Sequence, residues 1–176
     1  MSNLRLINET TITSGSSIVS ITDVFSADFE VYKIVFSEMT TVGTLQTSPN
    51  FRFINSGGSV VSSSDYCYAH LIMRSDASFT DQYATSQAQF YRFQAESVDQ
   101  APVFAVCVLY IFNPYSSSSY TFNIGQQSSH YSNPRYLASK GIGILKQTNT
   151  ITGFQFMFPS SDVSSGVIKT YGLRVD

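Results

Sequence analysis

The sequence predicts an all-β fold, namely an antiparallel, jelly-roll-like β-sandwich of about ten short strands. Hydrophobic residues make up 43% of the chain and aromatic residues 14%, whereas charged residues make up only 12%, about half of the ordinary share. Val, Ile, Thr, Tyr and Phe suit pleated surfaces, while exposed helix faces usually carry Glu, Lys and Arg. Turn residues recur at intervals of roughly 8–12 residues, with no helical period between them. We therefore expect a single domain over residues 1–176, in which residues 1–28 form a first-strand or docking segment.

The first strong strand signal lies at Phe29–Phe36, where Tyr32, Ile34 and Phe36 share one face. The opposite face is also partly apolar, which is typical of a central strand. The polar stretch Ser37–Asn50 follows and is predicted to be a loop. Three shorter strands are predicted in this half of the chain: Leu4–Ile7, Ser17–Val24 and Phe51–Asn55.

Two kinds of residue alternate in the next predicted strand, Asp65–Ser75. The small and aliphatic kind is predicted to face the core and comprises Cys67, Ala69, Leu71 and Met73. The other kind is predicted to lie at the surface or at a sheet–sheet contact and comprises Tyr66, Tyr68, His70 and Ile72.

The second half contains the longest apolar run, Val103–Phe112, which predicts a strand buried in the middle of a sheet. It ends at Asn113-Pro114, because proline cannot donate a hydrogen bond to a neighbouring strand. Near the C-terminus, Ile151–Pro159 and Val167–Asp176 are predicted to form a closing pair of strands around the core, and the first places Phe154, Phe156 and Phe158 on one face. Short strands are also expected at Gln89–Phe93, Tyr120–Ile124, Tyr136–Leu137 and Ile142–Leu145, and loops at Ser75–Ser86, Tyr115–Tyr120 and Gln126–Pro134.

Charge and the cysteines limit the kinds of partner and the compartment. A net charge of −2 and a pI near 5.6 provide no basic patch, so we expect no nucleic-acid partner. The N-terminus lacks the apolar segment of a secretory signal, and no run reaches the roughly 18 apolar residues of a membrane span, so we expect no membrane insertion. Cys67 and Cys107 each lie inside an apolar run, which favours buried thiols, with a single disulfide as the alternative; we expect synthesis in a reducing cytoplasm.

No pattern in the sequence predicts a catalytic residue, a metal site or a cofactor. The sequence contains two histidines, His70 and His130. Serine is so common in this chain that a serine near either histidine is expected by chance, and no Gly-x-Ser-x-Gly motif is present. The twelve acidic residues are scattered, so no carboxylate pair of a glycosidase stands out. Asp23, Asp28, Asp76 and Asp81 are expected in turns, where Asp commonly bonds its own backbone. No spacing of possible ligands requires a Ca²⁺ or Zn²⁺ site.

Aromatic residues in the predicted loops are the best candidates for a binding role. Tyrosine rings stack on sugar faces and their hydroxyl groups bond polar partners, and the same residues also suit subunit interfaces. A loop tyrosine that only packs on the sandwich and bonds a backbone carbonyl is the alternative. The candidate binding residues are Tyr115, Tyr120, His130, Tyr131 and Tyr136.

Four segments together resemble a β-sandwich module of tailed-phage virion proteins, especially those of marine cyanobacterial phages. They are Phe29-x-Val-Tyr-Lys-Ile-Val-Phe-Ser, Leu109-Tyr-Ile-Phe-Asn-Pro, Ile151-Thr-Gly-Phe-x-Phe and Ser165-Gly-Val-Ile-Lys-Thr-Tyr-Gly-Leu. The resemblance spans residues 29–174, and its motifs are strand residues and turn breakers. It therefore describes a fold more than an activity.

The resemblance implies a non-enzymatic structural protein on the exterior of a virion. It would act as a tail-fibre or appendage tip that recognises host-surface glycans, or else as a capsid or tail decoration protein; a glycan-degrading enzyme ranks last. Expected partners are other virion proteins and further copies of the chain, with a trimer as one form of homo-oligomer. Similar proteins often follow a long fibre shaft, and its absence from this sequence favours a compact protein that docks on the particle.

Overall fold

The computed structural model describes residues 3–13, 15–42, 49–76, 79–91, 105–132, 135–158 and 162–174. Eleven β-strands and no helix occur in this part of the chain, which confirms the predicted all-β class. The strands are β1 (Leu4–Ile12), β2 (Ile18–Ile21), β3 (Val31–Thr41), β4 (Asn50–Asn55), β5 (Tyr66–Arg74), β6 (Thr80–Gln87), β7 (Ala105–Phe112), β8 (Thr121–Ser132), β9 (Arg135–Leu145), β10 (Ile151–Met157) and β11 (Val163–Leu173).

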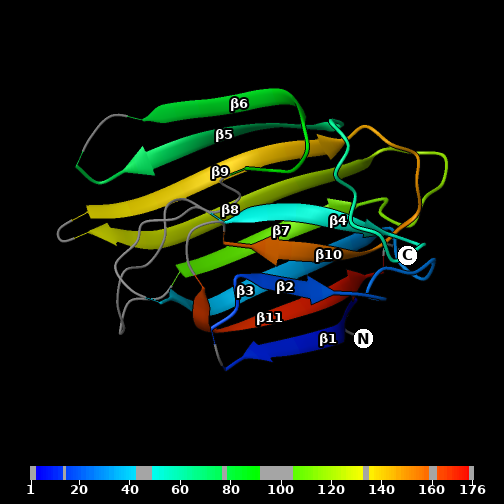
Figure 1. The fold of residues 1–176 in the computed structure, drawn as a ribbon, viewed down its shortest axis with the longest axis horizontal. Helices are drawn as coiled ribbons and strands as arrows, with labels where there is room; N and C mark the ends of the chain where they lie inside the picture. Colours follow the sequence, from blue (N-terminus) through cyan, green and yellow to red (C-terminus); the bar gives the residue numbers. More distant parts are fainter. Residues whose placement is uncertain are drawn as a thin grey trace.

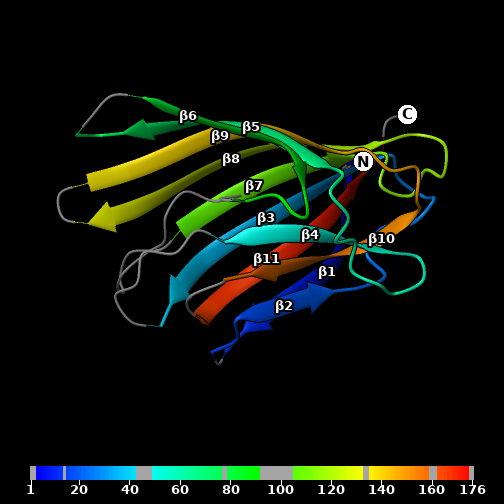
Figure 2. The same ribbon diagram turned by 45° about the horizontal axis from the view of Figure 1, so that its top comes forward.

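The strands form two antiparallel sheets of unequal size (Figure 1). The large sheet has eight strands in the order β1-β11-β3-β7-β8-β9-β5-β6, and the small sheet has three in the order β2-β10-β4. In both views the small sheet lies over the part of the large sheet that contains β7, β3 and β11, and it leaves β5 and β6 uncovered (Figure 2). The fold is thus a β-sandwich with one incomplete layer.

The core is a layer of aromatic rings between the two sheets. Phe154 and Phe156 of β10 point at Phe36 of β3, with ring centroids 6.4 and 4.9 Å from it. Phe154 also stacks on Phe51 of β4, at 5.3 Å and an interplanar angle of 17°. These four side chains are completely buried, so they join β10 and β4 of the small sheet to the middle of the large one.

The expected closing pair of strands is only partly correct. Phe154, Phe156 and Phe158 do share the buried face, as the alternation predicts. However, β10 pairs with β2 and β4, whereas β11 lies between β1 and β3 in the other sheet. The two strands therefore stand on opposite sides of the core, because both are lined with apolar residues that need an opposing layer.

The predicted core face of β5 is wrong, whereas the sheet–sheet contact that was one of two expectations for its other face is present at Tyr66 and Phe53. Tyr66 and Ile72 are buried, whereas Ala69 is exposed and Leu71 is 45% exposed. The Tyr66 ring meets the edge of Phe90 at 4.8 Å, and its hydroxyl accepts from the backbone N–H of Phe53 and donates to the carbonyl of Val61. A tyrosine whose hydroxyl is satisfied inside the core packs as well as an aliphatic residue, and this ring decides which face of β5 turns inward.

Several predicted loops are strands. β3 and β8 continue into Ser37–Asn50 and Gln126–Pro134, and β6 occupies most of Ser75–Ser86. β6 is polar because it is an edge strand of the large sheet and has a strand on one side only. Phe90 makes only an isolated bridge to Phe51, and the rest of Gln89–Phe93 beyond Tyr91 lies outside the described residues.

The separate strands predicted at Tyr136–Leu137 and Ile142–Leu145 are one strand, β9, and Gly141 and Gly143 lie inside it. A Cβ atom at Gly141 would stand 2.5 Å from the His70 ring. One at Gly143 would stand 2.6 Å from both Asn123 and Phe90. Glycine is therefore required here by close packing over the sheet rather than by a turn.

The two cysteines are thiols and lie on opposite faces of the large sheet. Cys107 is buried in the core, as predicted, whereas Cys67 is only half-buried on the far side. Three strand-to-strand steps separate them, since β7 and β5 have β8 and β9 between them. No disulfide can join them in this fold.

The aromatic layer yields a prediction about stability. Replacing Phe154 with Ala should lower the free energy of unfolding by about 3–5 kcal/mol, because the ring is completely buried between two sheets. The matched control is Phe79→Ala, whose ring is 68% exposed and whose loss should change stability by less than about 0.5 kcal/mol. Urea unfolding at one protein concentration measures both, and equal effects of the two substitutions would contradict the assignment of the core.

Candidate functional site

The most unusual surface is the face of the large sheet that points away from the small sheet, which we call the outer face. Strand alternation places every second residue of β5 to β9 on it. Two rows of paired residues cross these strands: Phe112, Phe122, Ile144 and Cys67 form one, and Tyr110, Ile124, Ile142, Ala69 and Tyr83 form the other. Neither of these two rows contains a charged side chain.

The outer face is exposed to solvent along these rows. Phe122, Ile124 and Ile142 expose between 41 and 58% of their surface, and Tyr83 exposes 77%. Isolated exposed apolar residues are common on protein surfaces, but a contiguous patch of them usually marks an interaction site. In the described part of the chain, no strand or loop covers this patch.

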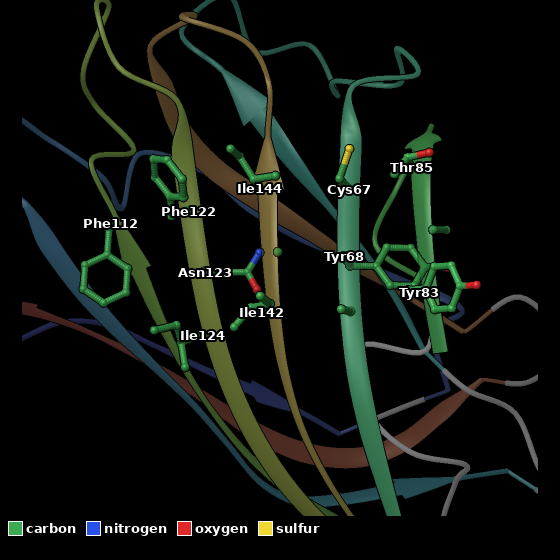
Figure 3. Close-up of a pocket in the computed structure, with 13 residues that line it drawn as sticks. Cys67, Tyr68, Tyr83, Thr85, Phe112, Phe122, Asn123, Ile124, Ile142 and Ile144 are labelled. Carbon is green, nitrogen blue, oxygen red and sulfur yellow. The ribbon is translucent and has the colours of Figure 1, made fainter. Parts of the chain in front are cut away.

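A hollow of about 430 Å³ lies within the outer face (Figure 3). Phe112 of β7 and Tyr83 of β6 stand at its opposite sides, and Ile142 lies between them. The small side chain of Ala69 leaves room at its floor, where the backbone of Gly143 also lies. The hollow can therefore accept an apolar or aromatic group, but it offers almost no polar atom that would orient a reacting substrate.

Charged residues begin in the next row of the outer face. Lys140 pairs in register with Leu71, which pairs with Asp81. These three residues border a shallower depression that shares Ile142 and Tyr83 with the hollow. At the far edge of the sheet, Lys169 of β11 forms an ion pair with Glu9 of β1 at 3.3 Å. On β3, Lys33 pairs in register with Tyr110, so the second row is free of charge only from β7 to β6.

The structure divides the predicted binding residues between the two ends of the sandwich. Tyr115 and Tyr120 lie in the β7–β8 loop, as predicted, and are 40 and 43% exposed. Tyr136 lies at the other end of the sandwich. It is near the start of β9, and the end of that strand, Leu145, pairs with Thr121 beside the loop; Tyr136 and Leu145 are about 30 Å apart along the strand. The backbones of His130 and Tyr131 belong to β8 near Tyr136, and their side chains lie outside the described part of the chain. The five residues therefore do not form one site.

The loop that carries Tyr115 and Tyr120 is fixed by its own serines. The Ser116 hydroxyl accepts hydrogen bonds from the backbone N–H groups of Ser118 and Ser119, at 3.2 and 3.1 Å. Asn113 adopts a left-handed conformation, with φ of 54°, and its N–H donates to the carbonyl of Glu30. The four-serine run is thus a structured turn that presents two tyrosines, which the composition alone did not reveal.

A polar group that was not predicted lies on the inner face of the large sheet, beside the aromatic core. Asn123, Gln127 and Ser139 are buried there, and His70 borders the same small hollow. In the described part of the chain, Asn123 Nδ2 and Gln127 Nε2 have no hydrogen-bond partner. Their positions follow strand alternation from the core residues of β7, so they could have been predicted only once the length of β8 was known.

None of these hollows has the features of a catalytic or metal centre. Among the residues that the structure describes, Asp81 is the only carboxylate that borders any of the three hollows. The described residues contain no cluster of three or more His, Cys, Asp or Glu side chains that could hold a metal ion. They also contain no helix long and apolar enough to cross a membrane.

Comparison with protein-family models, with curated proteins and with solved structures finds no match to this chain.

The pKa values of Tyr66 and Asp65 are shifted, and both shifts come from structural contacts. Burial raises the pKa of Tyr66 well above its ordinary value, although a hydrogen bond from the Phe53 backbone opposes the shift. Hydrogen bonds from Gln147 and Ser63 lower the pKa of Asp65 below 3.8, and Lys146 adds to the lowering. The Gln147 amide donates to the Asp65 carboxylate at 2.7 Å and also to the Ser63 hydroxyl, so this cluster ties the chain before β5 to the chain after β9.

The Asp65 cluster predicts a dependence of stability on pH. Because its pKa is lower in the folded than in the unfolded state, Asp65 stabilises the fold above its unfolded pKa, and the contribution is lost as the pH falls through the folded value. Asp65→Asn should therefore be less stable than wild type near neutral pH, with a difference that shrinks below about pH 4. Urea unfolding across a pH series measures this.

Gln147→Ala serves as the matched variant for this experiment, since it removes the group that lowers the pKa of Asp65 most. Like Asp65→Asn, it should make the free energy of unfolding depend less on pH than it does in the wild type. Parallel stability curves for the wild type and Asp65→Asn at all pH values would show that the carboxylate makes no such contribution.

Proposed function

We propose that this chain is a non-enzymatic structural protein on the exterior of a tailed-phage particle, where it forms part of an appendage that contacts the host surface. The uncovered apolar outer face of the large sheet is the observation that carries the proposal. A structural subunit needs such a face, because packing against neighbours removes it from water. An enzyme would instead concentrate polar groups in a hollow, and the hollow among Tyr83, Ile142 and Phe112 is almost entirely apolar.

The phage assignment rests on the resemblance of four strand segments and on their places in the fold. They lie on β3, β7, β10 and β11, which all contribute residues to the hydrophobic core. In the segment on β7, Asn113 and Pro114 end the strand, and Asn113 has a left-handed conformation. These motifs support a shared sandwich, and the virion role follows from it as a proposal.

The proposed host contact is the β7–β8 loop. Tyr115 and Tyr120 are exposed at one end of the sandwich, on a turn held by Ser116. Two half-exposed rings on a fixed turn suit stacking against sugar rings, and little entropy is lost when they bind. A single contact of this kind is weak, so many copies on one particle would supply the avidity.

A decoration protein is the second candidate, and the breadth of the outer face favours it. A protein that covers junctions between capsid or tail subunits needs one extended apolar surface more than it needs an exposed loop. In that case the outer face would lie on the particle and the two tyrosines would have no role in adsorption.

Adsorption of particles to host cells tests the proposed contact. Particles that carry Tyr115→Ala together with Tyr120→Ala should adsorb several-fold more slowly. The substitutions remove the rings that would stack on host-surface sugars and leave the core of the sandwich unchanged. Tyr136→Ala is the matched control, since it removes an even more exposed tyrosine, at 61%, from the opposite end. Equal adsorption by all three kinds of particle would contradict the host-contact proposal.

The wider assignment is tested by the composition of purified particles. The chain should be present in them, and cryo-electron microscopy should place it on the exterior. If the double tyrosine variant adsorbs normally and particles that lack the chain break more easily under heat or osmotic shock, the decoration protein is correct. Absence of the chain from purified particles would overturn both.

A further inference from the structure

We infer that the small polar hollow on the inner face of the large sheet binds a single uncharged oxygen atom through the amide groups of Asn123 and Gln127. The oxygen belongs to a water molecule or to a hydroxyl group of a bound saccharide, and the second source rests on the proposed contact with the host surface. Three properties of the hollow support such a site: its floor, its buried amide groups and its lack of charge.

The floor of the hollow consists of two glycines that lie side by side. Gly125 of β8 pairs in register with Gly141 of β9. A Cβ atom at Gly125 would stand 2.4 Å from Leu109 of β7, and one at Gly141 would stand 2.5 Å from His70 of β5. These two side chains close the row at its ends. The space that remains has a volume of about 10 Å³, which is about what the centre of one water molecule needs.

Two buried amide groups flank this floor. Asn123 and Gln127 come two residues before and two residues after Gly125, so strand alternation places all three on the inner face. Both border the hollow, and each is only 7% exposed. In the described part of the chain, neither Asn123 Nδ2 nor Gln127 Nε2 has a hydrogen-bond partner. Buried N–H groups in folded proteins are almost always bonded, so the pair calls for an acceptor.

One oxygen atom in the hollow satisfies both amide groups. The oxygen of water or of a hydroxyl group has two lone pairs and can accept one hydrogen bond from each amide. Ser139 pairs in register with Gln127 and also borders the hollow, and its hydroxyl group can accept the hydrogen of the bound oxygen. Each bonding position of the bound group is thus matched by a side chain of β8 or β9.

The lining of the hollow favours an uncharged ligand. Among the described residues, no Lys, Arg, Asp or Glu borders it. An ion would lose its hydration there without gaining an opposite charge. His70 is half-buried at the β5 end of the row, where the small sheet does not cover the large one (Figure 2), so the hollow can be reached from that side. The Tyr68 ring lies 5.0 Å from the His70 ring and offers a surface for a sugar ring.

The test uses nuclear magnetic resonance of the full chain and follows the side-chain amide signals of Asn123 and Gln127. In the protein without added ligand, both should show nuclear Overhauser effects to water with the sign given by a bound molecule. The Gln155 amide is the internal control, since it donates to the Ser20 hydroxyl in an exposed position and should show only the sign given by bulk water.

Gln127→Met removes one of the two amides and keeps the length of the side chain. It should shorten the lifetime of the water beside Asn123 by about tenfold, through the loss of one hydrogen bond. Gln126→Met is the matched control, because Gln126 is the preceding residue of β8, is exposed on the outer face and does not border the hollow. Ser139→Ala is a smaller change within the lining and should act in the same direction as Gln127→Met. Circular dichroism shows whether each variant is folded.

Glucose, galactose and N-acetylglucosamine at millimolar concentrations distinguish the two sources of the oxygen. If a saccharide supplies it, one of these sugars should displace the water and shift both amide signals in the wild type and in Gln126→Met, but not in Gln127→Met. If water alone supplies it, no sugar should do so and the contact with water should persist. Either result supports the site and identifies its ligand.

Amide groups that show neither a bound water nor a response to any of the three sugars would overturn the inference. A bound water whose lifetime is the same in the wild type, Gln127→Met and Ser139→Ala would overturn it as well. These outcomes are separate from those of the proposed function. The adsorption experiment changes only the β7–β8 loop, so slow adsorption of the double tyrosine variant would stand even if the hollow bound nothing.

Discussion

The contact of Phe154 and Phe156 with Phe36 is the interaction on which the arrangement of the whole chain depends. It fixes a three-stranded sheet over the middle of an eight-stranded one. Three strands span only about 14 Å in the hydrogen-bonding direction, whereas eight span about 38 Å. Most of the large sheet therefore cannot be covered by the small one. The inner face beyond the aromatic core carries polar residues such as Asn123 and Gln127, and the outer face has no covering layer among the described residues.

The same mismatch explains how much of the fold could be predicted from the sequence. Alternation correctly grouped Tyr32, Ile34 and Phe36 on one face of β3, and all three are buried in the core. It failed at β5, where Leu71 and Met73 on one face appeared at least as hydrophobic as the residues on the other. Alternation identifies two faces of a strand but does not show which of them another layer will cover. That choice depends on the Tyr66 hydroxyl, whose partners Phe53 and Val61 belong to distant parts of the sandwich.

The candidate binding residues illustrate a second limit. Turn residues located the β7–β8 loop that holds Tyr115 and Tyr120, since Asn113-Pro114 is a local signal. The length of β8 is not local. Gln126–Ser132 is polar and was therefore interpreted as a loop, yet backbone pairing with β9 continues through it and moves Tyr136 to the opposite end. Polar residues in a strand are favourable where one face meets solvent, so composition could not separate this strand from a loop.

The β7–β8 loop and the outer face differ in whether they need a partner. The β7–β8 loop satisfies its own hydrogen bonds through Ser116 and Asn113 and needs no partner to keep its shape. The outer face, in contrast, leaves Ile142 and Phe122 in water unless something covers them. Covering them favours the folded, associated state by mass action, so the stability of the sandwich should rise with the concentration of its partner. The proposed assembly through the face and the proposed recognition through the loop therefore use separate parts of the chain, and a substitution in one surface need not disturb the other.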